Sequence, residues 1–272
     1  MIIQHNIAAI NSYRNLGINQ SGLSKNLEKL SSGYRINRAG DDAAGLAISE
    51  SMRSQINGLN QAAKNANDAI GLIQTAEGAL TETHSMLQRL TTLATQSANG
   101  TYNTVARNNL QEEVNALISE IDRIANNTDF NGIKPIDSAS QSQKMTFQIG
   151  PTAGETITVD RAKMNASGIG VNSLKLTTLA KANAAIKTIN TAIDKVSAHR
   201  AKLGAAQNRL EHTVNNLKVT SENITAAESR IRDTDMADEI TAFTKNNILL
   251  QASQSMLAQS NSVPQSVLSL LG

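Results

Sequence analysis

Residues 179–231 decide the fold, and they read LAKANAAIKTINTAIDKVSAHRAKLGAAQNRLEHTVNNLKVTSENITAAESRI. Steps of alternately three and four residues from Leu179 reach an aliphatic side chain at most positions. The stripe comprises Leu179, Ala182, Ile186, Ile189, Ile193, Val196, Arg200, Leu203, Gln207, Leu210, Val214, Leu217, Ser221, Ile224, Glu228 and Ile231. A helical period kept over this length predicts one long helix, and a helix with a single apolar stripe needs a partner helix.

The first third of the chain carries matching stripes that can supply this partner. One runs from Met52 to Ala94 and a shorter one from Leu110 to Ile124, with turn-forming residues at 99–101 between them. The positions are Met52, Ile56, Leu59, Ala63, Ala66, Ile70, Ile73, Glu77, Leu80, His84, Leu87, Thr91 and Ala94, then Leu110, Val114, Leu117, Ile121 and Ile124. We therefore predict a mainly α fold: an elongated antiparallel bundle of three helices, formed by the N- and C-terminal halves.

The composition favours such a bundle over a compact enzyme. The 272 residues include three Phe, three Tyr and no Trp, whereas a globular core of this size normally uses more aromatic area. The absence of Cys excludes disulfides and thiolate chemistry. A net charge of +2 with scattered Lys and Arg argues against a nucleic-acid partner. No apolar stretch is long enough for membrane insertion. Gln4, His5, Asn6 and Asn11 interrupt the apolar run that a cleavable signal peptide needs, so any export would use another route.

Both end segments carry more apolar surface than one partner helix can cover. Three consecutive apolar residues, 248–250, point about 100° apart on a helix and require several neighbours. We expect these helices to be frayed in a monomer and to be covered by other copies, a chaperone or a membrane surface. The candidate polymerisation residues are Ile3, Ile7, Ile10, Leu23, Leu27, Leu30, Ile240, Phe243, Ile248, Leu249, Leu250, Met256, Leu257, Val267 and Leu270.

Helix boundaries and a small β-hairpin complete the prediction. Residues 31–33 can close the N-terminal helix, Asp41 and Asp42 can cap the next, and Asp233 and Asp235 lie at the C-terminal joint. In the middle, alternating residues at 145–149 and 157–159 flank a turn and predict a β-hairpin.

No pattern of catalytic, cofactor-binding or metal-binding residues stands out. The four histidines, His5, His84, His199 and His212, lack ligand spacing, and the acidic residues 233–239 lack the spacing and glycine of a calcium loop. We therefore expect a protein that is not an enzyme and needs no cofactor.

The stretch from Lys29 to Ser49, KLSSGYRINRAGDDAAGLAIS, resembles the N-terminal signature of bacterial flagellins. Further blocks resemble the same family in the same order: IQTAEGAL at 73–80, RAKLGAAQNRLEHTVNNL at 200–217, ENITAAESRIRDTDMADE at 222–239 and FTKNNILLQASQSMLAQSN at 243–261. The resemblance covers almost the whole chain except about fifty central residues, where other flagellins carry large variable domains.

The resemblance implies a structural subunit that self-polymerises into the extracellular flagellar filament and enables motility. It implies an inner-core domain of residues 1–32 and 234–272, a spoke linker at 33–44, and a bundle at 45–233 with the hairpin region at about 128–176. It further implies an export chaperone on the C-terminal helix, and filament cap and hook-associated proteins as partners.

A last implication concerns the vertebrate innate receptor for flagellin. Arg89 and Leu93 match the family's recognition stretch, and Glu113 occupies its acidic contact position. Thr91 and Thr92 stand where that stretch has Arg and Glu. The alternative interpretation of Arg89 and Glu113 is a surface ion pair or a contact between adjacent subunits.

Two other functions stay open at this point. A flagellin-like junction protein between hook and filament would share the end motifs. A coiled-coil adaptor anchored on a membrane surface is disfavoured, because only Lys25 and Lys29 supply basic charge near one end.

Overall fold

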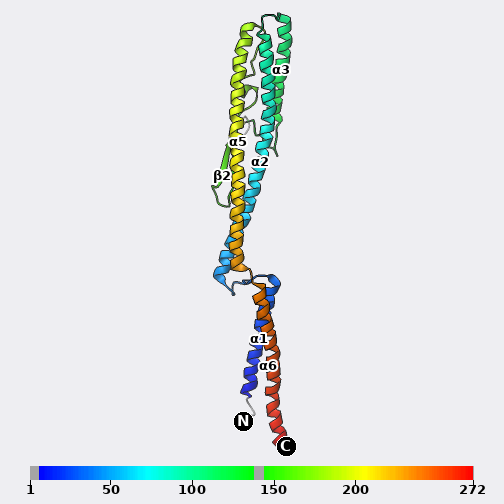
Figure 1. The fold of residues 1–272 in the computed structure, drawn as a ribbon, viewed down its shortest axis with the longest axis vertical. Helices are drawn as coiled ribbons and strands as arrows, with labels where there is room; N and C mark the ends of the chain where they lie inside the picture. Colours follow the sequence, from blue (N-terminus) through cyan, green and yellow to red (C-terminus); the bar gives the residue numbers. More distant parts are fainter. Residues whose placement is uncertain (1–5, 138–143, 272) are drawn as a thin grey trace. The chain divides into compact units, whose positions relative to one another are not determined.

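The computed structural model describes residues 6–137 and 144–271, and it confirms a mainly α fold with one small sheet (Figure 1). The elements in order are α1 (Ile7–Ser32), α2 (Ala43–Ser97), α3 (Thr104–Asn127), β1 (Lys144–Gln148), β2 (Thr156–Asp160), α4 (Ala166–Ile169), α5 (Leu179–Arg232) and α6 (Met236–Leu271). The chain divides into two compact units. Residues 57–221 form the bundle unit, and residues 1–56 with 222–272 form the terminal unit.

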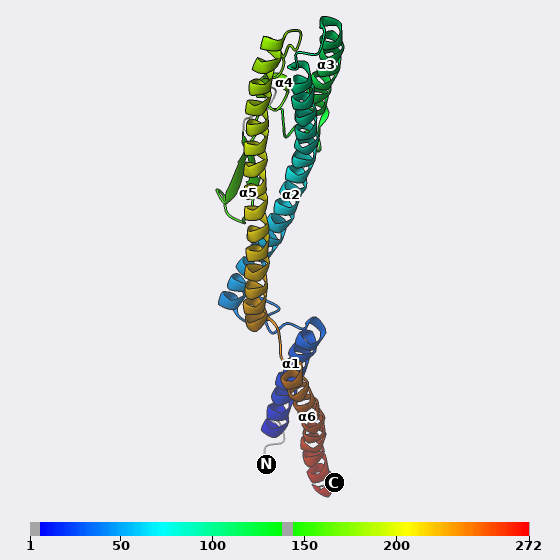
Figure 2. The ribbon, with the colours of Figure 1, turned by 45° about the horizontal axis from the view of Figure 1, so that its top comes forward.

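In the bundle unit, α3 and the first part of α5 lie side by side with α2 (Figures 1 and 2). The predicted long helix from Leu179 is confirmed, because α5 runs to Arg232 without interruption. The predicted break is confirmed as well: α2 ends at Ser97 and α3 begins at Thr104, where the Asn103 side chain accepts the Ala106 N–H. Arg107 donates to the carbonyls of Ser97 and Asn99 and so satisfies the end of α2.

The buried stripes differ from the predicted ones at every second position. On α2 about half of the predicted stripe is buried: Leu59, Ala66, Ile73, Leu80, Leu87 and Ala94. The alternate predicted positions are only partly buried, namely Ala63, Ile70, Glu77, His84 and Thr91. The fully buried residues beside them are Ala62, Ala69, Ala76, Thr83 and Leu90. On α5 the buried residues Ala185, Ala192, His199 and Ala206 likewise replace Ile186, Ile193, Arg200 and Gln207, and the predicted register returns at Leu210. The buried face therefore extends one residue to the side of the predicted stripe, while Ile70, Ile186 and Ile193 still pack against the core partly buried.

The predicted β-hairpin is confirmed, and the structure adds its register. Met145 pairs with Val159 and Phe147 with Ile157, so the alternating apolar residues share one face. Its turn lies against α2, where a Cβ atom added to Gly58 would come within 2.7 Å of the Pro151 Cβ. Asn65 on α2 also donates to the Gln148 carbonyl.

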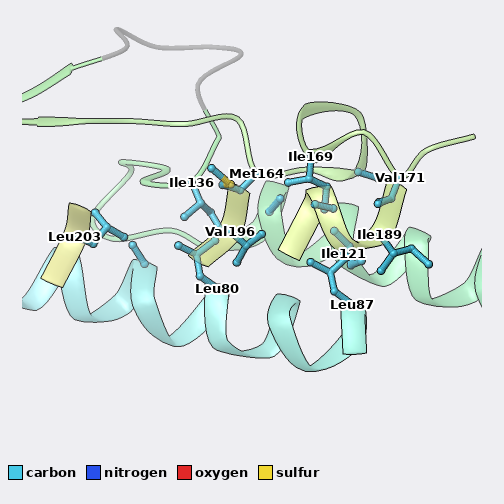
Figure 3. Packing of buried hydrophobic residues seen from close by; sticks show 14 of the residues in the cluster. Leu80, Leu87, Ile121, Ile136, Met164, Ile169, Val171, Ile189, Val196 and Leu203 are labelled. Carbon is cyan, nitrogen blue, oxygen red and sulfur yellow. The ribbon is translucent and has the colours of Figure 1, made fainter. Parts of the chain in front are cut away.

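The loop residues close the core over the three helices. Ile136, Met164, Ile169 and Val171 are buried against Leu80, Leu87, Ile121, Ile189, Val196 and Leu203 (Figure 3). The Asp122 carboxylate on α3 accepts the N–H of Ala166 at 2.7 Å, which fixes the start of α4. Gln111 accepts from the Leu176 N–H and donates to the Leu174 carbonyl, which holds the segment leading into α5.

In the terminal unit, α1 and α6 pack against each other as an antiparallel helix pair, called the terminal hairpin below. The predicted helix ends are confirmed: Gly33 ends α1 with φ 75°, the Asp42 carboxylate accepts the Gly45 N–H near the start of α2, and Asp235 accepts the Ala237 and Asp238 N–H groups at the start of α6.

Candidate assembly surfaces

The seam between α1 and α6 includes polar side chains that form hydrogen bonds across it. Asn19 Nδ2 donates to Ser253 Oγ at 2.8 Å, and Asn6 Nδ2 donates to the Ser260 carbonyl at 2.8 Å. Asn26 is buried in the seam, and its Nδ2 has no hydrogen-bond partner among the described residues. Polar side chains that bond across a helix pair fix its register and contribute less stability than an apolar seam.

Several large apolar side chains of the same two helices face away from the seam. On α1, Ile7, Ile10 and Ile18 are each about 60% exposed, and on α6, Ile248 is 61% and Met256 63% exposed. Side chains of this type are mostly buried in folded proteins, so their gathering on both helices of one pair is unusual for a surface exposed to water.

The predicted polymerisation residues fall into two groups. Seven are exposed on the outer faces: Ile7, Ile10, Leu27, Ile240, Ile248, Leu249 and Met256. Five are half-buried at or near the seam: Leu23, Leu30, Phe243, Leu250 and Leu257. Ile3 and the side chains of Val267 and Leu270 lie outside the described residues. The helix pair therefore uses only part of its predicted apolar set to hold itself together.

A separate polar pair lies on the bundle unit. Arg89 on α2 contacts Glu113 on α3, with both Nε and Nη2 within 2.8 Å of Glu113 Oε1. Both side chains are about half exposed, so the pair contributes little to stability and remains accessible to a partner. Leu93, by contrast, is fully buried in the core, so a direct contact to it would require the bundle to open. Thr91 and Thr92 direct their hydroxyls to carbonyls of their own helix.

Within residues 6–137 and 144–271, no three His, Asp or Glu side chains come together as metal ligands. Burial, followed by the charge of Lys202, lowers the pKa of His199. The backbone N–H groups of Arg38 and Asn37 lower the pKa of Asp41, because they donate to its carboxylate. No helix of the described residues is long and apolar enough to span a membrane.

The sequence matches two family models over most of its length. Residues 3–141 match the bacterial flagellin N-terminal helical region, and residues 186–271 match the bacterial flagellin C-terminal helical region. The chain belongs to the bacterial flagellin family. Membership identifies it as a structural subunit of the flagellar filament.

Full-length flagellins and a solved flagellin structure resemble the chain. It is 52% identical to a flagellin of Bacillus subtilis over 304 aligned residues, and 52% identical to a flagellin of Halalkalibacterium halodurans over 273, with all of each chain covered. The crystal structure of Bacillus cereus flagellin is 33% identical with a TM-score of 0.52, and covers 61% of this chain and 94% of its own. The match at 273 aligned residues agrees with a short flagellin that lacks a large variable domain.

Sequence reasoning missed two exposed residues and the seam of this flagellin-family chain. Tyr13 is 70% and Ile18 62% exposed, but both lie off the predicted stripe of α1. The seam could have been found from Asn19 and Asn26, which are seven residues apart and so share one helix face.

Proposed function

We propose that the chain polymerises through the outer apolar faces of α1 and α6, which neighbouring subunits cover in the filament. The proposal rests on one observation: isoleucines such as Ile7, Ile10 and Ile248 face outward, away from the seam between the two helices. Fully burying one such side chain contributes about 1.5–3 kcal/mol. Several neighbours can each cover a different face of α6, as three consecutive apolar residues at 248–250 require.

The proposal includes a layered organisation of the subunit. Residues 1–32 and 234–272 form the assembling inner core, residues 33–44 act as a linker, and residues 45–233 form the supporting bundle. The function resides in these interfaces, so we infer that the chain transforms no substrate.

The test is seeded growth of purified monomer, followed by electron microscopy and pelleting. Wild-type chain grows long filaments from sheared seeds, whereas Ile248→Ser raises the critical concentration about tenfold, since losing one apolar contact of about 1.4 kcal/mol is a factor of ten. Val105→Ser is the matched control, because Val105 is a 68% exposed aliphatic residue of the bundle unit. Equal growth of the two variants would argue against the proposal.

The same apolar faces need cover before assembly. We infer that an export chaperone binds α6 over residues 236–271, and that filament cap and hook-associated proteins contact the growing or anchored ends. Ile248 and Met256, each more than 60% exposed, are the surface that such partners would cover. Co-purification with the export chaperone, lost on Met256→Asp, tests the first of these contacts.

Recognition by the innate receptor is proposed at the Arg89 and Glu113 pair, which is accessible on the bundle. Arg89→Ala should weaken receptor binding, while Arg123→Ala, another exposed arginine on the bundle, serves as the control. Unchanged affinity of the Arg89→Ala variant would leave the pair with the structural role only.

A junction protein between hook and filament is the remaining alternative, as it would use similar terminal helices. A junction subunit acts in few copies and does not extend seeds by itself. Growth of long uniform filaments from the chain alone therefore separates the two functions.

A further inference from the structure

One arginine connects three segments at the base of the terminal helices. Arg232 is the last residue of α5, and its side chain is only 12% exposed. Its Nη1 donates to Glu50 Oε1 on α2 at 2.6 Å, and its guanidinium lies 4.8 Å from the ring centroid of Tyr34. Tyr34 belongs to the linker that follows α1, so this side chain joins segments that are almost two hundred residues apart.

Backbone hydrogen bonds pair the two linkers around the same arginine. The Arg35 N–H donates to the Arg232 carbonyl at 2.7 Å, and the Thr234 N–H donates to the Gly33 carbonyl at 3.0 Å. Tyr34 and Asp233 form an antiparallel bridge between these bonds. The carbonyls at the end of a helix lack partners within the helix, so this pairing also satisfies the end of α5.

The chemistry at this point suits arginine specifically. A planar guanidinium can stack on Tyr34 with one face and donate to Glu50 with its edge, whereas an amide offers neither the charge nor this stacking. The hydrogen bond from Arg232 lowers the pKa of Glu50, which favours the charged form of the carboxylate that pairs with the guanidinium.

We propose that Arg232 is a positioning residue for polymerisation: it locks the linkers at 33–42 and 233–235 together, so that α1 and α6 are presented jointly to neighbouring subunits. Arg232 acts through its contacts with Tyr34 and Glu50. The inference rests on the proposed function, because it assigns a residue that controls how the polymerising helices are presented. In the sequence these linkers carry only separate capping residues, and their pairing with each other depends on the fold.

The experiment compares full-length Arg232→Gln with Arg230→Gln in seeded growth. Arg230 lies in the same last turn of α5 but is exposed, so its variant is the matched control. We expect Arg232→Gln to raise the critical concentration roughly tenfold, the factor expected from losing one cation–π contact and one charged hydrogen bond. Circular dichroism of the monomers should show the same melting midpoint of the bundle for both variants.

A charge-reversed pair separates positioning from general loss of structure. Arg232→Glu and Glu50→Arg should each impair growth alone, and their combination should recover growth relative to either, because the ion pair is restored. Growth of Arg232→Gln equal to that of Arg230→Gln would overturn the proposal. So would slow growth with a lowered melting midpoint and no recovery in the reversed pair, because that result gives Arg232 a structural role only. Wild-type chain that fails to extend seeds would instead contradict the proposed function.

Discussion

The bundle unit and the terminal hairpin use the same helical spacing but cover very different shares of their apolar side chains. In the bundle, Leu80 and Ile189 are buried and polar residues face outward. In the hairpin, Asn26 is buried while Ile248 and Met256 are exposed. The difference teaches that an apolar stripe marks a surface that will be covered, and that it does not reveal whether the same chain or another molecule covers it.

The two regions also differ in what stabilises them. The bundle has a continuous apolar core that includes residues from its helices, its β-hairpin and its loops. In the terminal hairpin, hydrogen bonds of Asn6 and Asn19 fix the register of α1 on α6, but much of the apolar area stays exposed to water. We therefore expect the bundle to hold its structure as a monomer, and the hairpin to gain most of its stability on assembly.

The largest effect is expected from removing residues 256–272. This deletion takes away the end of α6 and none of the described bundle core, so polymerisation should be abolished while the remaining chain stays helical. Seeded growth and circular dichroism measure the two properties on one sample. Filaments formed by the truncated chain would contradict the assignment of assembly to the hairpin.

Leu87→Ala and Met256→Ala probe the comparison directly. Leu87 is fully buried and Met256 is 63% exposed. The first substitution should lower the free energy of unfolding of the monomer by about 2–5 kcal/mol, and the second should change it by no more than about 0.5 kcal/mol. Urea unfolding followed by circular dichroism provides both values. In seeded growth the order should reverse for equally folded protein, with Met256→Ala the more impaired.

Asn26→Leu replaces the buried amide of the seam with an apolar side chain. Its Nδ2 has no hydrogen-bond partner among the described residues, so removing the amide should stabilise the hairpin by about 1 kcal/mol. Hydrogen exchange of α1 and α6 in the monomer should slow roughly fivefold, since exchange follows local opening. Gln20→Leu changes an exposed position of α1 and is the control. Unchanged or faster exchange in Asn26→Leu would show that the seam is not limited by its buried amide.

The smallest expected effect is the pH dependence of the stability of the bundle. Burial and the charge of Lys202 lower the pKa of His199 from its usual value of 6.5, against the opposing charge of Asp160. The unfolded chain then binds this proton at a higher pH than the bundle does. His199 therefore contributes full stability above about pH 6.5, and this stability declines as the pH falls toward the lowered pKa. Melting midpoints measured between pH 7.5 and about pH 5 should fall less steeply for His199→Gln than for the original chain.

Much of the fold could be predicted from the sequence, because long apolar periods and caps are local signals. The limits of α5, the two strands of the β-hairpin and the helix ends at Gly33 and Asp235 all follow from neighbouring residues. The burial of Ala185 in place of Ile186 could not be predicted, because it depends on which neighbours surround α5.

The residues of the candidate sites could be predicted from the sequence, but the direction in which each side chain faces could not. Spacing identified Ile248 and Leu250 together, yet only the pairing of α1 with α6 places the first outward and the second at the seam. Likewise, the motif that includes Leu93 gives no sign that this residue is fully buried beside the exposed Arg89. The contact of Arg232 with Tyr34 arises from segments far apart in sequence and has no local signature.

Thiol labelling of a single cysteine at position 248 tests the central claim most directly. The natural sequence contains no Cys, so the Ile248→Cys side chain is the only thiol in that variant. We predict rapid labelling of the monomer and strong protection in filaments, because neighbouring subunits cover this exposed face. Equal labelling rates in monomer and filament would contradict the claim that the outer apolar face of the hairpin is the polymerisation surface.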